Sequence, residues 1–391
     1  MIYYGKQTID EQDIKAVVKV LRSDFLTCGP KIEEFEVKFA QYVGVKYTVA
    51  VANGTAALHL ACLAVGLGKG QELITSPLTF CASSNCALYC GARPLFVDIN
   101  DQGLIDENKI EAKITKKTKI IIPVHYSGLP CNLDKIKKIA QKYKLIVIED
   151  ASHALGAKYK KSKIGDCQYS DMAVFSFHPV KHITTGEGGM VTTNNEKIYE
   201  RLLMLRSHGI TKDQRKFINQ QSTISNQQFP SWYYEMQELG FNYRITDIQS
   251  ALGISQLKKV NKFVSERREI ARIYDKAFKS HREIKIIQAN KDQLNAYHLY
   301  PIRVKNEKIR LKLFNHLKEN GIFCQVHYIP VYWHPYYQKL ACPPSGGGYK
   351  KGLCPKTEDF YQQELSIPLY YSLKKEEAEL VIKSVLSFFK D

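Results

Sequence analysis

One lysine in this chain, between a serine and a glycine-rich turn, has a setting suited to covalent chemistry. Lys181 lies in the stretch 175–189, Phe-Ser-Phe-His-Pro-Val-Lys-His-Ile-Thr-Thr-Gly-Glu-Gly-Gly, and an upstream apolar run, Ile-Val-Ile-Glu-Asp, ends at Asp150. A pyridoxal phosphate (PLP) enzyme needs an amine for a Schiff base and a carboxylate for the pyridinium nitrogen. The pair predicts a PLP site in which Lys181 also moves a proton, its pKa lowered by burial.

A second group of residues is suited to hold a phosphate. Residues 53–57, Asn-Gly-Thr-Ala-Ala, follow an apolar run and open a helical pattern, so their backbone N–H groups can approach an anion. Capped helices of this kind are common, and the stretch alone is a weak signal. Ser176, at another strand end, strengthens it because its hydroxyl can reach the same phosphate.

Two further side chains follow strand ends in the same region. The ring of Phe80 could stack on the pyridine face of the cofactor, although a plain core position explains it equally well. His153, three residues after Asp150, could bond the phenolic oxygen of the ring, although a lone histidine is more often structural. Because ligands of open α/β sheets bind at the carboxyl ends of the strands, we expect these side chains to converge.

The composition is that of a globular protein with room for more than one domain. The chain has 391 residues, of which 44% are hydrophobic and 24% charged. The net charge of +17 comes from scattered lysines rather than from one basic stripe with aromatic residues, which argues against nucleic acid as a partner. A solvated lysine-rich surface is the simplest explanation, and a polyanionic small substrate is the next.

Membrane, metal and disulfide sites are not indicated. No apolar run approaches the ~20 residues of a membrane span, and the first residues carry no secretory apolar region, so we expect a cytoplasmic protein. The ten cysteines contain no C-x-x-C pair and no zinc-ligand spacing, which predicts reduced structural thiols and no metal site.

Short apolar runs alternate with helical patterns through the first 190 residues, as in a mostly parallel sheet covered by helices. Strands are expected at residues 47–51, 72–76, 94–98, 119–124, 144–148, 173–177 and 189–193, and helices at 55–65, 133–142, 200–206, 248–263 and 265–278. Later, strands are expected at 298–304 and 323–327, and helices at 308–320 and 375–389. This predicts a large domain over residues 1–250, and connecting helices with a small α+β domain over 251–391. Residues 209–234 form a polar excursion, and 341–352 a glycine-rich loop.

Several stretches, in order along nearly the whole chain, resemble the DegT/DnrJ/EryC1/StrS sugar aminotransferases. They are residues 53–60 (Asn-Gly-Thr-Ala-Ala-Leu-His-Leu), 79–80, 149–156, 175–181, 186–189, 239–249, 326–330 and 365–368. The resemblance implies PLP-dependent fold type I, with a seven-stranded sheet in the large domain. It implies that Lys181 binds PLP, Asp150 pairs with the pyridinium and His153 contacts the phenolic oxygen. Phe80 would stack, and Gly54, Thr55, Ala56 and Ser176 would hold the phosphate.

The same resemblance implies a homodimer whose active site is shared between subunits. Asn242 matches an asparagine that completes the phosphate site of the neighbouring subunit, and Arg244 could clamp a diphosphate, although an arginine in such a loop is often only an ion-pair partner. Other segments match the surroundings of a sugar nucleotide: Tyr4, Asp24, Phe25, Leu26, Thr27, His327, Tyr328, Val331, Tyr332, Trp333 and His334.

Within the family, residues 151–157, 176–181, 205–210, 255–259 and 298–302 most resemble the aminotransferases of pseudaminic acid biosynthesis. This implies L-glutamate as the amino donor and UDP-2-acetamido-2,6-dideoxy-β-L-arabino-hex-4-ulose as the acceptor. A bacillosamine- or perosamine-type aminotransferase, a PLP-dependent sugar dehydratase and a non-catalytic sugar-nucleotide binder are the alternatives. Dehydratases carry histidine in place of Lys181, and a pure binder has no use for an electron sink. His182, where relatives have Asn or Pro, and residues 219–228 and 345–348 depart from the family pattern.

Overall fold

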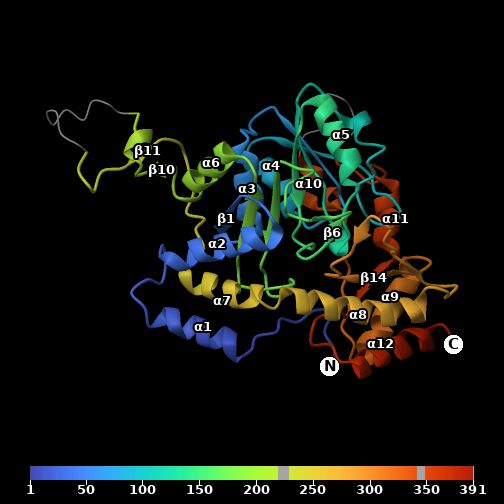
Figure 1. Cartoon of the computed structure of the whole chain (residues 1–391). Coiled ribbons are helices and arrows are strands. Elements are labelled where there is room, and N and C mark those ends of the chain that lie inside the picture. Colours follow the sequence, from blue (N-terminus) through green and yellow to red (C-terminus); the bar gives the residue numbers. More distant parts are fainter. Residues whose placement is uncertain (219–228, 341–347, 391) are drawn as a thin grey trace.

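A seven-stranded sheet forms the centre of the molecule (Figure 1). The computed structural model describes residues 1–218, 229–340 and 348–390. Across the sheet the strands are β1 (Tyr47–Val51), β9 (Gly189–Thr193), β8 (Met172–Ser176), β5 (Ile146–Asp150), β4 (Thr118–Ile122), β2 (Glu72–Thr75) and β3 (Arg93–Phe96). Only β9 runs antiparallel to its neighbours, so the other strands end at one common edge. The mostly parallel seven-stranded sheet is as expected.

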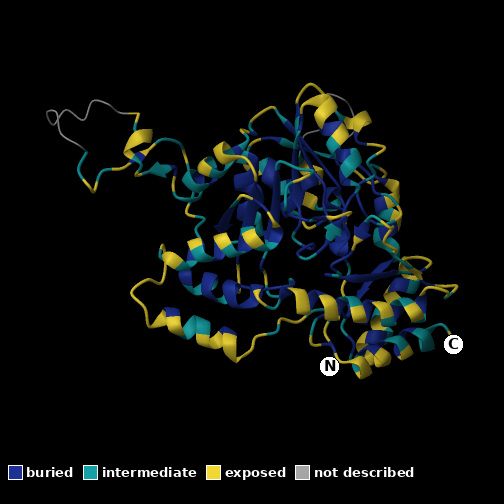
Figure 2. Cartoon of the chain, in the orientation of Figure 1, coloured by how far each residue is buried: buried dark blue, intermediate teal, exposed yellow. Residues whose placement is uncertain are grey.

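Helices cover both faces of this sheet, which explains why its strands are apolar on both sides. Val147 and Ile148, adjacent on β5, belong to two different buried clusters. One face packs against α3 (Gly54–Ala64), α4 (Ala82–Tyr89) and α6 (Glu196–Arg206); the other packs against α2 (Pro30–Val43), α5 (Leu133–Tyr143) and α7 (Asp247–Leu257). The buried strands lie between two partly exposed helical layers (Figure 2).

The helix α1 (Glu11–Leu21) lies against α7 at the outside of the molecule (Figure 1). Asp10 caps its first turn. The buried carboxylate of Asp13 is 2.6 Å from the amine of Lys259, which ties α1 to the start of α8. Most of α1 stays exposed (Figure 2), including the apolar side chains of Ile14 and Leu21.

A smaller sheet begins beyond the long helix α8 (Val260–Phe278). Its antiparallel strands are β12 (Lys285–Ile286), β14 (Tyr300–Arg303) and β15 (Glu364–Ile367). This sheet shares a buried cluster with α8, α9 (Glu307–Glu319) and α12 (Lys375–Phe388). It is the α+β unit expected in the C-terminal part of the chain.

Later segments also contact the large unit. β13 (Gln293–Leu294) pairs with β6 (Lys158–Tyr159), which pairs with β7 (Ser162–Lys163). Phe96 on β3 packs against aromatic residues of the stretch that holds the short helices η4 (Val331–Trp333) and α10 (Pro335–Lys339), before α11 (Pro355–Gln363). The division at residues 250/251 stays a prediction.

Two expected elements differ from the structure. The strand expected at 323–327 is wrong: the segment makes isolated bridges from Ile322 and Gln325, and the backbone N–H of His327 donates to the side chain of Glu364. The two helices expected to divide near residue 264 divide at Lys258–Lys259, and α8 runs unbroken from Val260. A two-stranded ribbon pairs β10 (Ile210–Thr211), at the start of the polar excursion, with β11 (Glu235–Met236), directly after it. Residues 219–228 and most of the loop at 341–352 lie outside the described residues.

Candidate active site

A cavity of about 520 Å³ opens at the carboxyl edge of the large sheet. It is lined by residues that follow β1, β2, β4, β5 and β8, by Glu187 before β9, and by His298, His327 and Tyr328 from the C-terminal part. The strands bring together Gly54, Thr55, Phe80, Asp150, His153, Ser176 and Lys181, all expected at the site. The convergence of these side chains is therefore observed.

The start of α3 forms one wall of the cavity. Asn53 caps the helix by accepting a hydrogen bond from the backbone N–H of Ala56 at 2.8 Å. Gly54 and Thr55 line the cavity, and their N–H groups belong to a helical turn that lacks intrahelical acceptors. A Cβ atom on Gly54 would lie 3.0 Å from the Cβ of Ser176, so only glycine lets the two segments approach this closely. Such a helix start beside a hydroxyl suits a phosphate.

Gly189 supports this wall from behind, and its replacement by alanine tests the packing. The added Cβ would lie 2.5 Å from the carbonyl oxygen of Asn53 and 2.9 Å from the nitrogen of Gly54. Because both contacts are with backbone, we expect Gly189→Ala to lower the free energy of unfolding by about 1–3 kcal/mol in urea titrations. Gly68→Ala, where a Cβ meets no atom within 4 Å, is the matched control and should shift the midpoint far less. Equal midpoints for the two variants would contradict the expectation.

The amine of Lys181 lies inside the cavity, 3.4 Å from Nε2 of His298. Burial lowers the pKa of Lys181 to about 8, against the opposing effect of the Asp150 charge. No carboxylate forms an ion pair with this amine in the described parts of the chain. Lys181 is therefore much more readily neutral, and nucleophilic, than a solvated lysine.

Asp150 ends β5 with its carboxylate in the cavity and only 5% of the residue exposed. One oxygen accepts a hydrogen bond from the hydroxyl of Ser83 at 2.6 Å, and the other accepts from the backbone N–H of Ser152 at 3.1 Å. These two bonds fix the orientation of the carboxylate. It can therefore present a negative charge to a cationic ring nitrogen.

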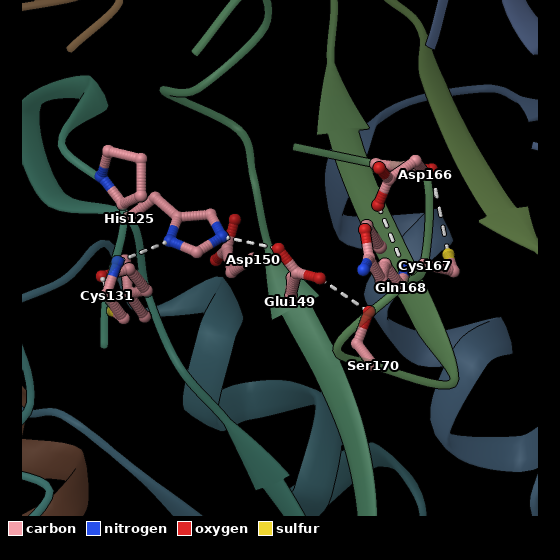
Figure 3. Close-up of polar contacts among 12 residues, drawn as sticks. His125, Cys131, Glu149, Asp150, Asp166, Cys167, Gln168 and Ser170 are labelled. Atoms are coloured by element: carbon pink, nitrogen blue, oxygen red, sulfur yellow. Dashed lines mark hydrogen bonds and ion pairs between the residues drawn. The ribbon is translucent and has the colours of Figure 1, made fainter. Parts of the chain in front are cut away.

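A second pair of side chains holds the strand end that carries Asp150 (Figure 3). Nε2 of His125 donates to Glu149 at 2.7 Å, because its Nδ1 already accepts from the backbone N–H of Cys131 at 3.1 Å. The other oxygen of Glu149 accepts from Ser170 at 2.5 Å. The backbone N–H of His125 in turn donates to the carbonyl of Asp150. This buried network links the ends of β4 and β5 and keeps Asp150 in place.

His153 lies between the aromatic groups of the cavity. Its Nε2 is 3.2 Å from the hydroxyl of Tyr328, and its ring centre is 4.2 Å from that of His298. Burial first, and then the charge of Lys181, hold the pKa of His153 well below its usual value, so the ring is neutral. Nδ1 is buried without a hydrogen-bond partner. A buried polar nitrogen of this kind calls for a ligand atom.

Phe80, Tyr4, His327 and Tyr328 form the remaining wall. Phe80 is 63% exposed, so it is not the core residue of the alternative interpretation. Its ring centre lies 6.5 Å from that of Tyr328, and the ring of Tyr4 lies 5.5 Å from that of His327. An aromatic surface here can cover a flat ligand ring.

Other expected site residues lie outside this cavity. Ala56 is turned to its cap at Asn53. Val331 and Tyr332 are fully buried against Phe96 and do not line the cavity, and their contact with a ligand stays a prediction. Trp333 and His334 follow them outside the cavity lining. Asp24–Thr27, Asn242 and Arg244 are also not among the lining residues. Bridges from Thr27 to Thr246 and from Arg244 to Val51 instead connect these segments to the start of α7 and to the end of β1.

Two functional residues were not predicted from the sequence. Ser83, which holds Asp150, comes from the start of α4, and His298, which contacts Lys181, precedes β14. His298 falls in a stretch, 298–302, that matches relatives, and this is the one signal that could have drawn attention to it. Ser83 carries no signal that distinguishes it from the neighbouring serine.

Comparison with known proteins decides the family. The sequence model of the DegT/DnrJ/EryC1/StrS aminotransferase family matches residues 7–386. The chain belongs to this family. It is 39% identical to a UDP-4-amino-4,6-dideoxy-N-acetyl-β-L-altrosamine transaminase of Campylobacter jejuni, over 100% of this chain and 98% of the relative. It is 36% identical to a GDP-perosamine synthase of Escherichia coli O157:H7, over 93% and 91%.

Solved structures agree with this assignment. PseC of Helicobacter pylori, an aminotransferase of pseudaminic acid biosynthesis, superposes with a TM-score of 0.88 at 34% identity, over 100% of this chain and 99% of that chain. The PLP form of the sugar aminotransferase Spr1654 of Streptococcus pneumoniae gives a TM-score of 0.88 at 29% identity, over 100% and 98%. The chain is thus a PLP-dependent sugar aminotransferase of fold type I, and these predictions are confirmed.

The side chains of the cavity fit PLP. The site offers an amine of lowered pKa, a buried carboxylate without an ion-pair partner in the described residues, an unpaired His153 nitrogen and a helix start beside Ser176. These groups correspond to the aldehyde, the ring nitrogen, the phenolic oxygen and the phosphate of the cofactor.

Proposed function

We propose that this enzyme transfers the amino group of L-glutamate to C4 of UDP-2-acetamido-2,6-dideoxy-β-L-arabino-hex-4-ulose. The product would be UDP-4-amino-4,6-dideoxy-N-acetyl-β-L-altrosamine, an intermediate of pseudaminic acid biosynthesis. The observation that carries the proposal is the full-length similarity to a transaminase of that name, together with a cavity lined by Gly54, Thr55, Phe80, Asp150, His153, Ser176 and Lys181. We also propose a cytoplasmic location. No helix in the described part of the chain is long and apolar enough to cross a membrane.

The residues divide the chemistry among them. Bound PLP supplies an electron sink for the carbanion formed when the donor loses its α-proton. Lys181 would hold the cofactor through its amine and, as the free amine, would accept the proton that leaves the donor carbon. Asp150 keeps the ring nitrogen protonated, His153 binds the phenolic oxygen, and Phe80 covers the ring. Gly54, Thr55 and Ser176 hold the phosphate, with Ala56 behind them in the first turn of α3.

The substrate would bind above the cofactor, against Tyr4, His327 and Tyr328, which line the outer wall of the cavity. A neutral His327 and the hydroxyls of Tyr4 and Tyr328 can bond the hydroxyl and carbonyl oxygens of a sugar without the desolvation cost of a charge. Trp333 and His334, which do not line the cavity of their own chain, are proposed as further substrate contacts.

The active site would be completed by a second subunit. Asn242 is exposed, and it does not line the cavity of its own chain. The same is true of the exposed residues Asp24–Thr27, and the partly exposed Arg244 does not line the cavity either. Phe25 and Leu26 are exposed apolar side chains in the same region, as are Leu21 and Leu239. A homodimer would bury this surface. Asn242 would then bind the phosphate, and Arg244 the diphosphate, in the neighbouring subunit.

A panel of keto sugars tests the substrate. Purified enzyme with PLP and L-glutamate is expected to aminate the β-L-arabino 4-keto UDP-sugar, with a gain of one amino group by mass spectrometry and release of 2-oxoglutarate. UDP- and dTDP-linked 4-keto sugars of other configurations should react more slowly. Equal or faster turnover of the D-xylo epimer would overturn the pseudaminate assignment, and a dehydrated product would indicate a dehydratase.

A second sugar remains a specific alternative. The 36% identity to a GDP-perosamine synthase over nearly the full chain favours testing a GDP-linked 4-keto sugar in the same panel. Preferential amination of that sugar would replace the proposed acceptor and leave the aminotransferase chemistry unchanged.

A further inference from the structure

A chain of polar side chains leads from the core of the small unit to the cavity wall. Oε1 of Glu364 lies 2.5 Å from Oγ of Ser366, so the two groups share a hydrogen bond. Oγ of Ser366 lies 2.9 Å from Nδ1 of His327. The other oxygen of Glu364 accepts from the backbone N–H of His327 at 2.7 Å. His327 lines the cavity, so the chain connects a buried acid with the ligand site.

The strand β15 explains why these groups face one another. Glu364 and Ser366 are two residues apart and therefore on one face of the strand, whereas Leu365 and Ile367 pack in the core of the small unit. Backbone hydrogen bonds in both directions between Gln325 and Ser366 set the register of the neighbouring segment. That register places His327 opposite the two polar side chains.

The carboxyl of Glu364 keeps its proton at a higher pH than an ordinary glutamic acid does. Glu364 and Ser366 are fully buried, and no ion pair to Glu364 occurs among the described residues. Burial raises the pKa of Glu364 to about 8, so its carboxyl is mostly protonated at neutral pH. Burial, and then the charge of Lys181, lower the pKa of His327 to about 3, so the ring carries a single hydrogen.

Two arrangements of the hydrogens follow from these contacts. A protonated Glu364 donates to Ser366, whose hydroxyl then donates to Nδ1 of His327, and the ring hydrogen lies on Nε2. An ionised Glu364 instead accepts from Ser366, whose oxygen accepts from Nδ1–H, and Nε2 carries a lone pair. The oxygen of Glu364 that accepts from the backbone of His327 is the same in both arrangements.

We propose that Glu364 is a positioning residue that sets, through Ser366, which ring nitrogen of His327 carries the hydrogen. His327 then acts as a hydrogen-bond donor toward the cavity when Glu364 is protonated and as an acceptor when it is ionised. A donor suits a carbonyl oxygen or an anionic oxygen of the ligand. The binding of a keto group is thereby linked to an acid that the ligand does not touch. This consequence rests on the proposed function, whereas the tautomer itself does not.

Other titratable groups surround Glu364, Ser366 and His327. The Tyr126 hydroxyl donates to the carbonyl of His327 at 2.8 Å, and Arg310 acts on Glu364 from α9 while it donates to the carbonyl of Tyr361. Further groups near Glu364 or His327 are Cys324, Tyr4, Tyr328, His153 and Lys181. Lys181 also titrates near pH 8, so its effect must be separated from that of Glu364.

Nitrogen-15 NMR of the histidine ring nitrogens separates the effect of Glu364 on His327 from that of Lys181. The full-length enzyme, loaded with PLP and labelled at histidine, is titrated from about pH 6 to about pH 10, with His327→Gln used to assign the signals. In the wild type we expect the hydrogen of His327 to move from Nε2 to Nδ1 as the pH rises through about 8. In Glu364→Gln the amide donates to Ser366 at every pH, so the hydrogen should stay on Nε2. A single wild-type tautomer, or continued switching in the variant, would overturn the proposal.

Two serine variants test the relay itself. Ser366→Thr keeps the hydroxyl and should retain the switch, whereas Ser366→Ala removes the connection and should uncouple the His327 tautomer from Glu364. If Ser366→Ala still switches like the wild type, the relay is refuted. In turnover assays, Glu364→Gln should remove the rise in KM for the keto sugar above about pH 8 and leave the glutamate half-reaction unchanged. The NMR result stands whichever sugar proves to be the substrate.

Discussion

Lys181→Ala is expected to abolish turnover and the visible absorbance of lysine-bound PLP. The amine at this position is the one that lies in the cavity without a carboxylate partner among the described residues, and burial lowers its pKa to about 8. Alanine removes both the covalent link and the group that moves the proton, which together account for a loss on the order of 10⁴-fold in kcat. The measurement is single-turnover kinetics with PLP in excess, together with an absorbance spectrum of the dialysed enzyme.

The control for Lys181→Ala is Lys116→Ala, at an exposed position far along the chain. This variant should keep both the absorbance and the activity, because solvated lysines contribute little to the site. Lys181→Arg adds a second control, since it keeps the positive charge but cannot form the link. Normal turnover by either Lys181 variant would exclude the assigned role.

The formation of the lysine–PLP link should also depend on pH. A lysine with a pKa of about 8 gains neutral amine as the pH rises toward that value, whereas a solvated lysine does so near 10.5. Reconstitution of the PLP-free enzyme should therefore quicken up to about pH 8 and then level off.

The parts of the site that could be predicted from the sequence are those that depend on strand ends. Asp150 ends an apolar run and Lys181 follows another. Parallel strands bring their carboxyl ends to one edge of a sheet, whichever order the strands take within it. The same reasoning predicted Phe80 and Ser176 as residues of the site. The apolar runs located all seven strands to within a few residues because these strands are buried on both faces.

The parts that could not be predicted depend on how distant segments meet. Ser83 reaches Asp150 because α4 packs beside β2, and His298 reaches Lys181 because the small unit folds back over the edge of the sheet. The segment at 323–327 has the apolar residues of a strand. However, the backbone N–H of His327 donates its hydrogen bond to the side chain of Glu364 rather than to a neighbouring strand. Nothing in the local sequence indicates such a partner.

Asp150→Asn is expected to have the next largest effect. The carboxylate is fixed by Ser83 and Ser152 and is buried, so its charge acts on a bound ring nitrogen with little screening by solvent. Asparagine keeps the size but loses the charge, so the ring nitrogen loses its proton and the electron sink weakens. The loss in kcat should be on the order of 10²–10³-fold, as for the removal of one preorganised electrostatic group.

Two further variants make this result specific to charge and orientation. Asp101→Asn, at an exposed carboxylate 3.3 Å from Lys356, is the matched control and should leave kcat unchanged. Ser83→Ala removes the 2.6 Å hydrogen bond to Asp150 but keeps the charge, so it should cost about tenfold, which is the loss of one hydrogen bond to a charged group. The order wild type, Ser83→Ala, Asp150→Asn in falling kcat is the expected result. If Asp150→Asn retained more activity than Ser83→Ala, the carboxylate would be a structural anchor rather than the partner of the ring nitrogen.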